Sequence, residues 1–426
     1  MGKKQSNLVF VLHASLAAFG TYFCMYAFRK PFSVATFEGL AYFGVNYKIL
    51  LVIAQVVGYA LSKFVGIKVI SELKPNRRLV YLISLIVMAE LSLLLFAWVP
   101  APYNIFFMFL NGIPLGMIWG IVFSYIEGRR FTDILGVVLS ASFIVSSGVV
   151  KSVGLYVMTH WGVSEFWMPF VTGALFFVPL LLCSYLLQNV PPPTPEDIEN
   201  RTERIPMTAE DRRTLVKQFL FPLLLVVVFY TFLTAFRDFR DNFARELWDS
   251  IGYQGDVSVF STSEIIIAIV VLLIIGTIFY IKDNFKALLT YHALLILGTL
   301  VLAASTLMYQ TGILDPFVWM VCTGFGLYIC YVPFNCLFFD RFIAAFKVKG
   351  NSGFLIYIAD AFGYVGSVLV LLYKNFGQAK LSWLNFFVYG TYAVAFIGII
   401  ITVVLFLHFG ARHKSQKINK QLDYGQ

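Results

Sequence analysis

Twelve apolar segments, each about 20 residues long, constrain this chain more than any other feature of its sequence. A helix needs roughly 20 apolar residues to cross the roughly 30 Å hydrocarbon core of a bilayer. Only 13% of the 426 residues are charged, whereas roughly 25% is typical of soluble globular proteins. We therefore predict an all-α membrane protein with twelve transmembrane helices. The segments are 8–28, 46–68, 79–98, 103–126, 134–157, 167–187, 218–240, 259–281, 287–309, 317–339, 351–373 and 383–407.

A polar connector separates the first six segments from the last six. Residues 188–217 contain the run Pro191-Pro192-Pro193 and eleven charged side chains, a composition that does not remain in lipid. The pattern predicts two six-helix bundles joined by a soluble linker. The predicted parts are an N-terminal bundle at 1–187, a cytoplasmic linker at 188–217, a C-terminal bundle at 218–407 and a basic cytoplasmic tail at 408–426.

The distribution of basic residues predicts the orientation of the chain. Most of the 32 Lys and Arg residues fall in the N-terminus, the even-numbered loops and the C-terminal tail, and positively charged loops remain in the cytoplasm. We expect both termini to be cytoplasmic, with the chain in a plasma membrane of the bacterial inner-membrane type. The net charge of +9 then reflects topology and not binding to nucleic acid.

Sequence patterns of enzymes and metal sites are missing. The five cysteines are scattered without metal-ligand spacing, and no nucleotide-binding or nucleophile motif occurs. We expect no catalytic residue, no cofactor and no metal.

Several ionisable residues lie inside the apolar segments, where each costs about 2.5–3.5 kcal/mol on insertion scales. Tyr22, Tyr26 and Arg29 share one face of the first segment, and Tyr59 and Lys63 share one face of the second with Gln55. Charged groups in such places usually face a cavity or one another.

Arg29 and Arg237 occupy similar depths in the first and seventh segments, 21 and 19 residues after the segments begin. If a pseudo-twofold axis relates the bundles, the two guanidinium groups face each other across a central cavity. Two planar forks of donors suit a phosphate or carboxylate dianion. The alternative is that both arginines extend to the outer interface from their helix ends.

Other charged residues predict contacts between helices. Arg237 can reach Asp241 at i+4. Lys151 and Glu264 both fall in the outer leaflet, so they would form a latch between the bundles that closes the outer face if their two helices meet.

Lys63 and Asp360 are offset by only about 6 Å along the membrane normal, so they are candidates for an inner contact. The competing roles are substrate contact for Lys63 and proton acceptance for Asp360. Glu90 has no evident charged partner and is either a protonatable site or a hydrogen-bonded structural group.

Two stretches of the chain carry a resemblance to a known family. Residues 22–32, YFCMYAFRKPF, and residues 58–64, GYALSKF, resemble the first two helices of the organophosphate:phosphate antiporters of the major facilitator superfamily. Arg237 in the seventh segment is a weaker match. The resemblance implies the major facilitator fold, in which helices 2 and 11, and helices 5 and 8, meet between the bundles. It also implies that Arg29 and Arg237 grip a substrate phosphate, with Tyr22, Tyr26, Tyr59 and Lys63 lining the cavity.

The chain departs from that family at several places, among them the extra charged residues Glu90, Lys151, Asp238 and Asp360. The histidine of helix five has no counterpart in residues 142–147, and the acid expected after helix two is displaced to Glu72. These departures leave the substrate open.

The sequence predicts a secondary active transporter that moves a small organic anion by alternating access, with an organophosphate or sugar phosphate as the first candidate. Phosphate or a proton would be the coupling ion, and we expect a monomer in the bilayer. The alternatives are a proton-coupled symporter of another small solute and a sensor that binds its solute without moving it. The candidate substrate-binding residues are Arg29, Arg237, Tyr22, Tyr26, Tyr59 and Lys63, and the candidate gating or coupling residues are Lys30, Asp241, Lys151, Glu264, Asp360 and Glu90.

Overall fold

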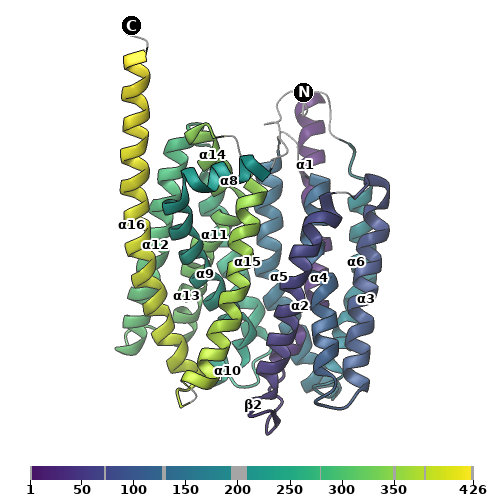
Figure 1. Cartoon of the computed structure of the whole chain (residues 1–426). Coiled ribbons are helices and arrows are strands. Elements are labelled where there is room, and N and C mark those ends of the chain that lie inside the picture. Colours follow the sequence, from purple (N-terminus) through teal and green to yellow (C-terminus); the bar gives the residue numbers. More distant parts are fainter. Residues whose placement is uncertain are drawn as a thin grey trace.

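The chain forms two six-helix halves that lie side by side (Figure 1). The computed structural model describes residues 2–71, 73–126, 131–192, 209–278, 280–348, 352–378 and 380–423. The first half consists of α1 (Gly2–Met25), α2 (Tyr47–Ser71), α3 (Arg78–Trp98), α4 (Ile105–Ile126), α5 (Thr132–Trp161) and α6 (Met168–Gln188). The second consists of α9 (Leu220–Asn242), α11 (Ser258–Ile278), α12 (Asn284–Gln310), α13 (Pro316–Cys336), α15 (Ser352–Leu372) and α16 (Trp383–Asp423).

The prediction of twelve membrane-spanning helices is confirmed. In the described ranges, twelve helices are long and apolar enough to cross a membrane, and they coincide with the twelve predicted segments. We therefore treat the chain as a multi-pass membrane protein. α1 begins and α16 ends at the same end of the halves (Figure 1), which we call the inner end; the opposite end is the outer end.

Short elements connect the long helices. The 3-10 turns η1 (Tyr26–Phe28) and η2 (Pro31–Val34) and the strands β1 (Ala41–Tyr42) and β2 (Val45–Asn46) link α1 to α2, and η3 (Pro75–Arg77) precedes α3. The other short helices are α8 (Ala209–Gln218), α10 (Ala244–Ser250), α14 (Phe338–Phe346) and the π-helical turn η4 (Tyr373–Gly377).

The ends of the predicted linker form helix at α6 and α8, whereas residues 193–208 lie outside the described part, as does Glu72. α16 continues without a break through the residues predicted as a basic tail, as far as Asp423 (Figure 1).

Two pairs of helices make the most extensive contacts between the halves in the described ranges. α5 packs against α11, and α2 packs against α15, which are the fifth, eighth, second and eleventh long helices of the chain. We call the region where the two halves meet the seam. Gly148 allows the close approach of α5, because a Cβ there would lie 2.8 Å from Cβ of Glu264 on α11. Small residues are typical where helices approach closely in membranes.

Candidate functional site

The first helix is interrupted where the predicted anchor residue lies. α1 ends at Met25, and η1 and η2 carry the chain to Val34, with Arg29 and Lys30 between them. Pro31 opens η2 and has no N–H to continue an α-helix. Non-helical backbone at membrane depth occurs where it is buried in protein or lines a cavity. Arg29 therefore lies between two 3-10 turns, in a stretch of backbone that is buried in the protein.

Arg29 is a buried cation without an acid partner among the described residues. Its guanidinium lies over the ring of Tyr59, with Cζ 4.0 Å from the centroid, and 5.9 Å from the ring of Tyr26. Only 6% of the residue is exposed, and Nε has no hydrogen-bond partner within the described ranges. The rings orient the guanidinium through cation–π attraction, and its donors remain free for another group.

Arg237 on α9 has a comparable ring contact but is already paired. Its Cζ lies 3.9 Å from the centroid of Tyr331, and Nη2 donates to Oδ1 of Asp238 at 2.7 Å. The second oxygen of Asp238 accepts from Ser367 Oγ at 2.9 Å. The predicted Arg237–Asp241 ion pair is wrong, because Asp238 is nearer to the guanidinium and other donors hold Asp241.

The predicted tyrosines are buried close to both arginines. The rings of Tyr22 and Tyr26 meet edge to face at 5.6 Å, and Tyr59 is 2% exposed. The phenol of Tyr26 interacts electrostatically with both Arg29 and Arg237. The structure thus brings residues of both halves to one region of the seam, although it records no direct contact between the two guanidinium groups within the described ranges.

Asp241 on α9 binds three donors from the first half. Its Oδ1 accepts from Ser147 Oγ and Lys151 Nζ, and its Oδ2 pairs with Lys30 Nζ. Lys30 Nζ also donates to Asn242 Oδ1 at 2.9 Å. All of these groups are buried, so they link the two halves beside Arg29.

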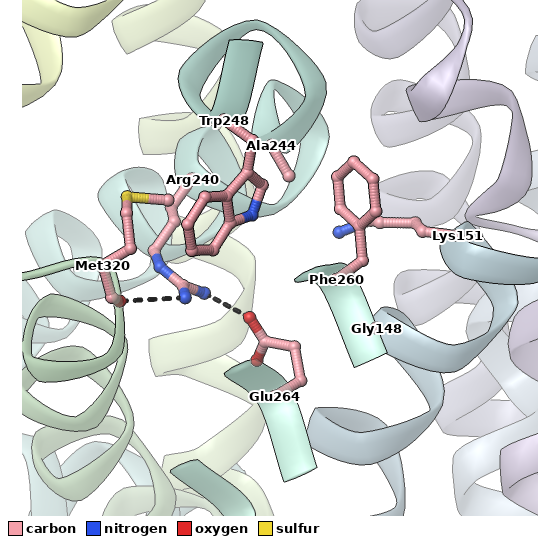
Figure 2. A pocket seen from close by; sticks show the side chains of 8 residues that line it. All are labelled: Gly148, Lys151, Arg240, Ala244, Trp248, Phe260, Glu264 and Met320. Carbon is pink, nitrogen blue, oxygen red and sulfur yellow. Dashed lines mark hydrogen bonds and ion pairs between the residues drawn. The ribbon is translucent and has the colours of Figure 1, made fainter. Parts of the chain in front are cut away.

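Glu264 on α11 pairs with Arg240 and not with Lys151, so the predicted Lys151–Glu264 contact is wrong. Arg240 Nη1 lies 2.5 Å from Glu264 Oε1, and Nη2 donates to the carbonyl of Met320 at 3.1 Å (Figure 2). The prediction of similar depth holds, because Lys151 and Glu264 line the same pocket. Depth along the membrane does not specify which of several neighbouring charges form a pair. The pocket is lined by Gly148, Lys151, Arg240, Ala244, Trp248, Phe260, Glu264 and Met320 (Figure 2).

The predicted contact between Lys63 and Asp360 is confirmed. Lys63 Nζ on α2 lies 3.5 Å from Asp360 Oδ2 on α15, across the seam. Asp360 also accepts from the hydroxyl of Tyr230 at 2.5 Å. Lys63 Nζ also lies 5.5 Å from the centroid of the Tyr59 ring, so a chain of contacts runs from Arg29 through Tyr59 and Lys63 to Asp360. Whether Lys63 and Asp360 bind substrate, gate or transfer a proton stays a prediction.

Glu90 lies away from the seam, between α3 and α6. Its carboxyl faces Gly173, where an added Cβ would lie 2.9 Å from Cδ of Glu90. The expectation that it lacks a charged partner agrees with the described residues, where neither carboxyl oxygen has a hydrogen-bond partner. Its predicted coupling role stays a prediction.

Two features of the site do not emerge from the sequence. Lys48 Nζ pairs with Glu246 Oε1 of α10 at 2.6 Å, a further link between the halves. Lys48 lies at the start of one apolar segment and Glu246 lies in a loop far along the chain. The sequence does not show that these two places meet, so it does not suggest the pair. The second feature is that Asn111 supports the backbone after the end of α1. The sequence signal that could have indicated it is that Asn111 is a lone amide in an apolar segment.

Among the described residues, the buried charged side chains at the seam carry an excess of two positive charges. Around Arg29 and its neighbours there are six basic and four acidic side chains, and the Lys48–Glu246 pair is neutral as a whole. The basic residues are Arg29, Lys30, Lys63, Lys151, Arg237 and Arg240, and the acidic residues are Asp238, Asp241, Glu264 and Asp360.

Solved structures with the same fold cover almost the whole chain. A D-xylose–proton symporter matches with a TM-score of 0.59 and 16% identity over 93% of this chain and 96% of its own. A mutant of the nucleoside transporter NupG matches with a TM-score of 0.59 and 15% identity over 94% of this chain and 99% of its own. A bacterial homologue of the human drug peptide transporters PepT1 and PepT2 matches with a TM-score of 0.62 and 11% identity over 95% of this chain and 99% of its own. The predicted twelve-helix major facilitator fold is thereby confirmed.

Sequence comparisons identify the family. No curated protein matches the chain. A family model described as a family of unknown function, DUF5690, matches residues 31–412, and the chain therefore belongs to that family.

Proposed function

We propose that this protein is a secondary transporter that moves a small organic anion by alternating access, with Arg29 as the anion anchor. The observation that carries the proposal is the buried guanidinium of Arg29, which lies over the ring of Tyr59 and has no acid partner among the described residues. A buried charge without compensation is costly, so an anionic ligand at this point offsets that cost.

The charges around Arg29 support an anion and not a neutral solute. The residue that follows Arg29 is a lysine, whereas the residue that follows Arg237 is the aspartate that neutralises it. The two halves therefore differ at corresponding positions. Of these two arginines, Arg237 is paired with an acid, whereas Arg29 is without one among the described residues. With two positive charges in excess at the seam, a dianion such as an organophosphate or a dicarboxylate restores neutrality.

The fold supports transport. Symporters of xylose, and transporters of nucleosides and peptides, share the twelve-helix arrangement, and substrates of such folds bind between the halves near the bilayer midplane. Arg29 lies just after the end of α1, against Tyr59 of α2, where the halves meet.

Coupling to protons is the main alternative to exchange for phosphate. Asp360 pairs with Lys63 across the seam and accepts from Tyr230, so protonation of its carboxyl would weaken this contact between the halves. The chain would then be a proton symporter of its anion or of another small solute. A sensor that binds the anion without moving it uses the same site.

The remaining parts of the proposal concern the setting of the protein. We place it as a monomer in a plasma membrane, with the inner end, where α1 begins and α16 ends, in the cytoplasm. The positive charge of the inner loops supports this orientation. Accessibility of cysteines introduced at the two ends to a membrane-impermeant reagent tests it.

A thermal-shift screen of the purified protein tests the anion anchor. We expect glycerol phosphate, inorganic phosphate or succinate to raise the unfolding temperature, and neutral sugars to have no effect. Arg29→Ala should abolish the shift. Arg412→Ala is the matched control, because its guanidinium also lies 4.0 Å from a ring, that of Phe219, far from Arg29 in the fold. Stabilisation by neutral sugars alone, unchanged in Arg29→Ala, would refute the proposal.

Uptake into proteoliposomes separates the remaining alternatives. Accumulation of the labelled anion identified by the screen shows transport, and its absence despite binding favours a sensor. If protons drive accumulation, Asp360→Asn should abolish uptake driven by a pH gradient and retain exchange of internal for external anion. If both activities survive in Asp360→Asn, Asp360 is not the proton acceptor.

A further inference from the structure

The backbone that carries Arg29 depends on side chains of other helices for its hydrogen bonds. At the interruption of α1, the carbonyl of Phe28 accepts from Asn111 Nδ2 at 3.1 Å, and the carbonyl of Arg29 accepts from Gln55 Nε2 at 3.0 Å. Backbone groups that leave a helix within a membrane must find partners in the protein. Asn111 of α4 and Gln55 of α2 supply them at two successive carbonyls.

Asn111 and Gln55 also bind each other. Gln55 Nε2 donates to Asn111 Oδ1 at 2.8 Å, and Asn111 Nδ2 donates a further bond to the carbonyl of Ala89 at 3.1 Å. Asn111 is fully buried and Gln55 is 3% exposed. Each polar atom of the Asn111 amide is therefore used, which ties α2, α3 and α4 to the end of α1.

Glycines fix the distance between the helices that carry these two amides. A Cβ on Gly112 would lie 2.9 Å from the backbone nitrogen of Tyr59, and one on Gly58 would overlap the carbonyl of Phe109. α2 and α4 are thus in backbone contact, which sets Gln55 and Tyr59 at a defined position relative to Asn111.

We propose that Asn111 and Gln55 are positioning residues for Arg29. No acid partner within the described ranges orients the guanidinium of Arg29, so its position is set by its own backbone and by the ring of Tyr59. The two amides hold that backbone, and Cζ of the guanidinium lies 4.0 Å from the centroid of the ring. This inference rests on the proposed function, because it assigns the amides to the anion anchor.

Asn111→Asp tests the inference with almost no change of shape. An aspartate accepts hydrogen bonds but cannot donate to the carbonyls of Phe28 and Ala89. Asn104→Asp is the matched control. Asn104 is also fully buried in the first half, donates to the carbonyl of Phe96 at 3.2 Å and accepts from Tyr47 at 2.5 Å, but it does not touch the interruption.

Binding of glycerol phosphate and of succinate is measured by titration of the unfolding temperature. We expect Asn111→Asp to weaken anion binding about tenfold or more, because misplacement of a binding group by about 1 Å can have effects of this size. Asn104→Asp should lower the unfolding temperature and leave the affinity unchanged. Equal affinities in Asn111→Asp and the wild type, or equal losses of affinity in both variants, would overturn the inference.

Hydrogen exchange of residues 26–34 provides a second measurement that does not depend on a ligand. Asn111→Asp and Gln55→Met should each accelerate exchange in this segment more than Asn104→Asp does, and Gln55→Met serves if Asn111→Asp does not fold. Unchanged exchange in both would also overturn the inference. Arg29→Ala should abolish anion binding without this acceleration, so a failure of the anion proposal is distinguishable from a failure of the positioning role.

Discussion

Gly148 of α5 is the position where a single methyl group should most directly test the contact between the halves. An added Cβ would overlap the carbonyl of Phe260 and would lie 2.8 Å from both Cβ and Cγ of Glu264. Carbon atoms normally pack at about 3.5–4.0 Å, so α5 and α11 must separate by roughly 1 Å. Because Phe260 contributes backbone, a side-chain rotation does not relieve the overlap.

The expected cost of Gly148→Ala follows from this overlap. Overpacking of a close contact typically costs about 1–3 kcal/mol. The cost applies to the arrangement in which α5 and α11 are packed together, and it is relieved when the halves separate at this point. In a protein that alternates between two arrangements, about 1–3 kcal/mol changes their ratio about 5- to 150-fold.

Distances between spin labels at the outer end would detect the change. Phe43, between β1 and β2, is 82% exposed, and Ile313, between α12 and α13, is 71% exposed. Cysteines at these two positions report on the two halves. We expect Gly148→Ala to increase the population with a long distance between the labels and to lower the unfolding temperature.

Gly136→Ala is the control on the same helix. A Cβ there has only Phe123 Cε2 near it, at 3.9 Å, which is ordinary contact. If Gly148→Ala and Gly136→Ala give the same distance distribution and the same unfolding temperature, the close packing at Gly148 does not hold the halves together, and the reasoning is wrong.

Three further predictions follow from single contacts. Glu264→Gln leaves the buried Arg240 without its acid partner, so we expect a loss of about 3–5 kcal/mol in unfolding free energy, seen as a lower unfolding temperature. Asp249→Asn breaks the half-buried pair with Arg245 within one short helix and should cost at most about 1 kcal/mol, and equal shifts would contradict this. Gly116→Ala should destabilise the protein by about 1–3 kcal/mol, because its Cβ would lie 2.8 Å from the carbonyl of Tyr59, whereas Gly410→Ala, with no atom within 4 Å, should have no such effect. The Lys286 N–H lowers the pKa of Asp283, which caps α12. Protection of the Lys286 amide from hydrogen exchange should therefore be present above the unfolded pKa of about 4 and should be lost as the pH falls further. Asp283→Asn keeps an acceptor but does not titrate, so it should remove this pH dependence, and an unchanged dependence would exclude the cap as its cause.

The fold was predictable because lipid selects for a local property of the sequence. A segment of about 20 apolar residues must be a helix in a bilayer, since each backbone polar group needs a partner within the segment. The predicted segments at 8–28 and 218–240 carry this information without reference to the rest of the chain. The seam contacts of helices 2 with 11 and 5 with 8 came instead from the family resemblance.

The candidate site was predictable only in part. Arg29, Tyr59 and Lys63 are recognisable because polar groups are costly in apolar segments, and the structure places them together. Their partners depend on contacts between distant segments. Asp241 has Arg237 at i−4 on its own helix, yet it binds Lys30 and Lys151, because three donors of the other half converge on it.

The sequence alone therefore determined that the chain spans a membrane twelve times and that a small set of charges lies within its helices, because the apolar length of a segment and the cost of a buried charge are local quantities. Only the tertiary structure decided which charges neutralise one another. It pairs Arg237 with Asp238, Arg240 with Glu264 and Asp241 with Lys30 and Lys151, and within the described ranges it leaves Arg29 on Tyr59 without an acid. Ion pairing in a low-dielectric interior depends on distances of a few ångströms between atoms of different helices, and such distances are set by packing, down to the missing Cβ of Gly112 and Gly148.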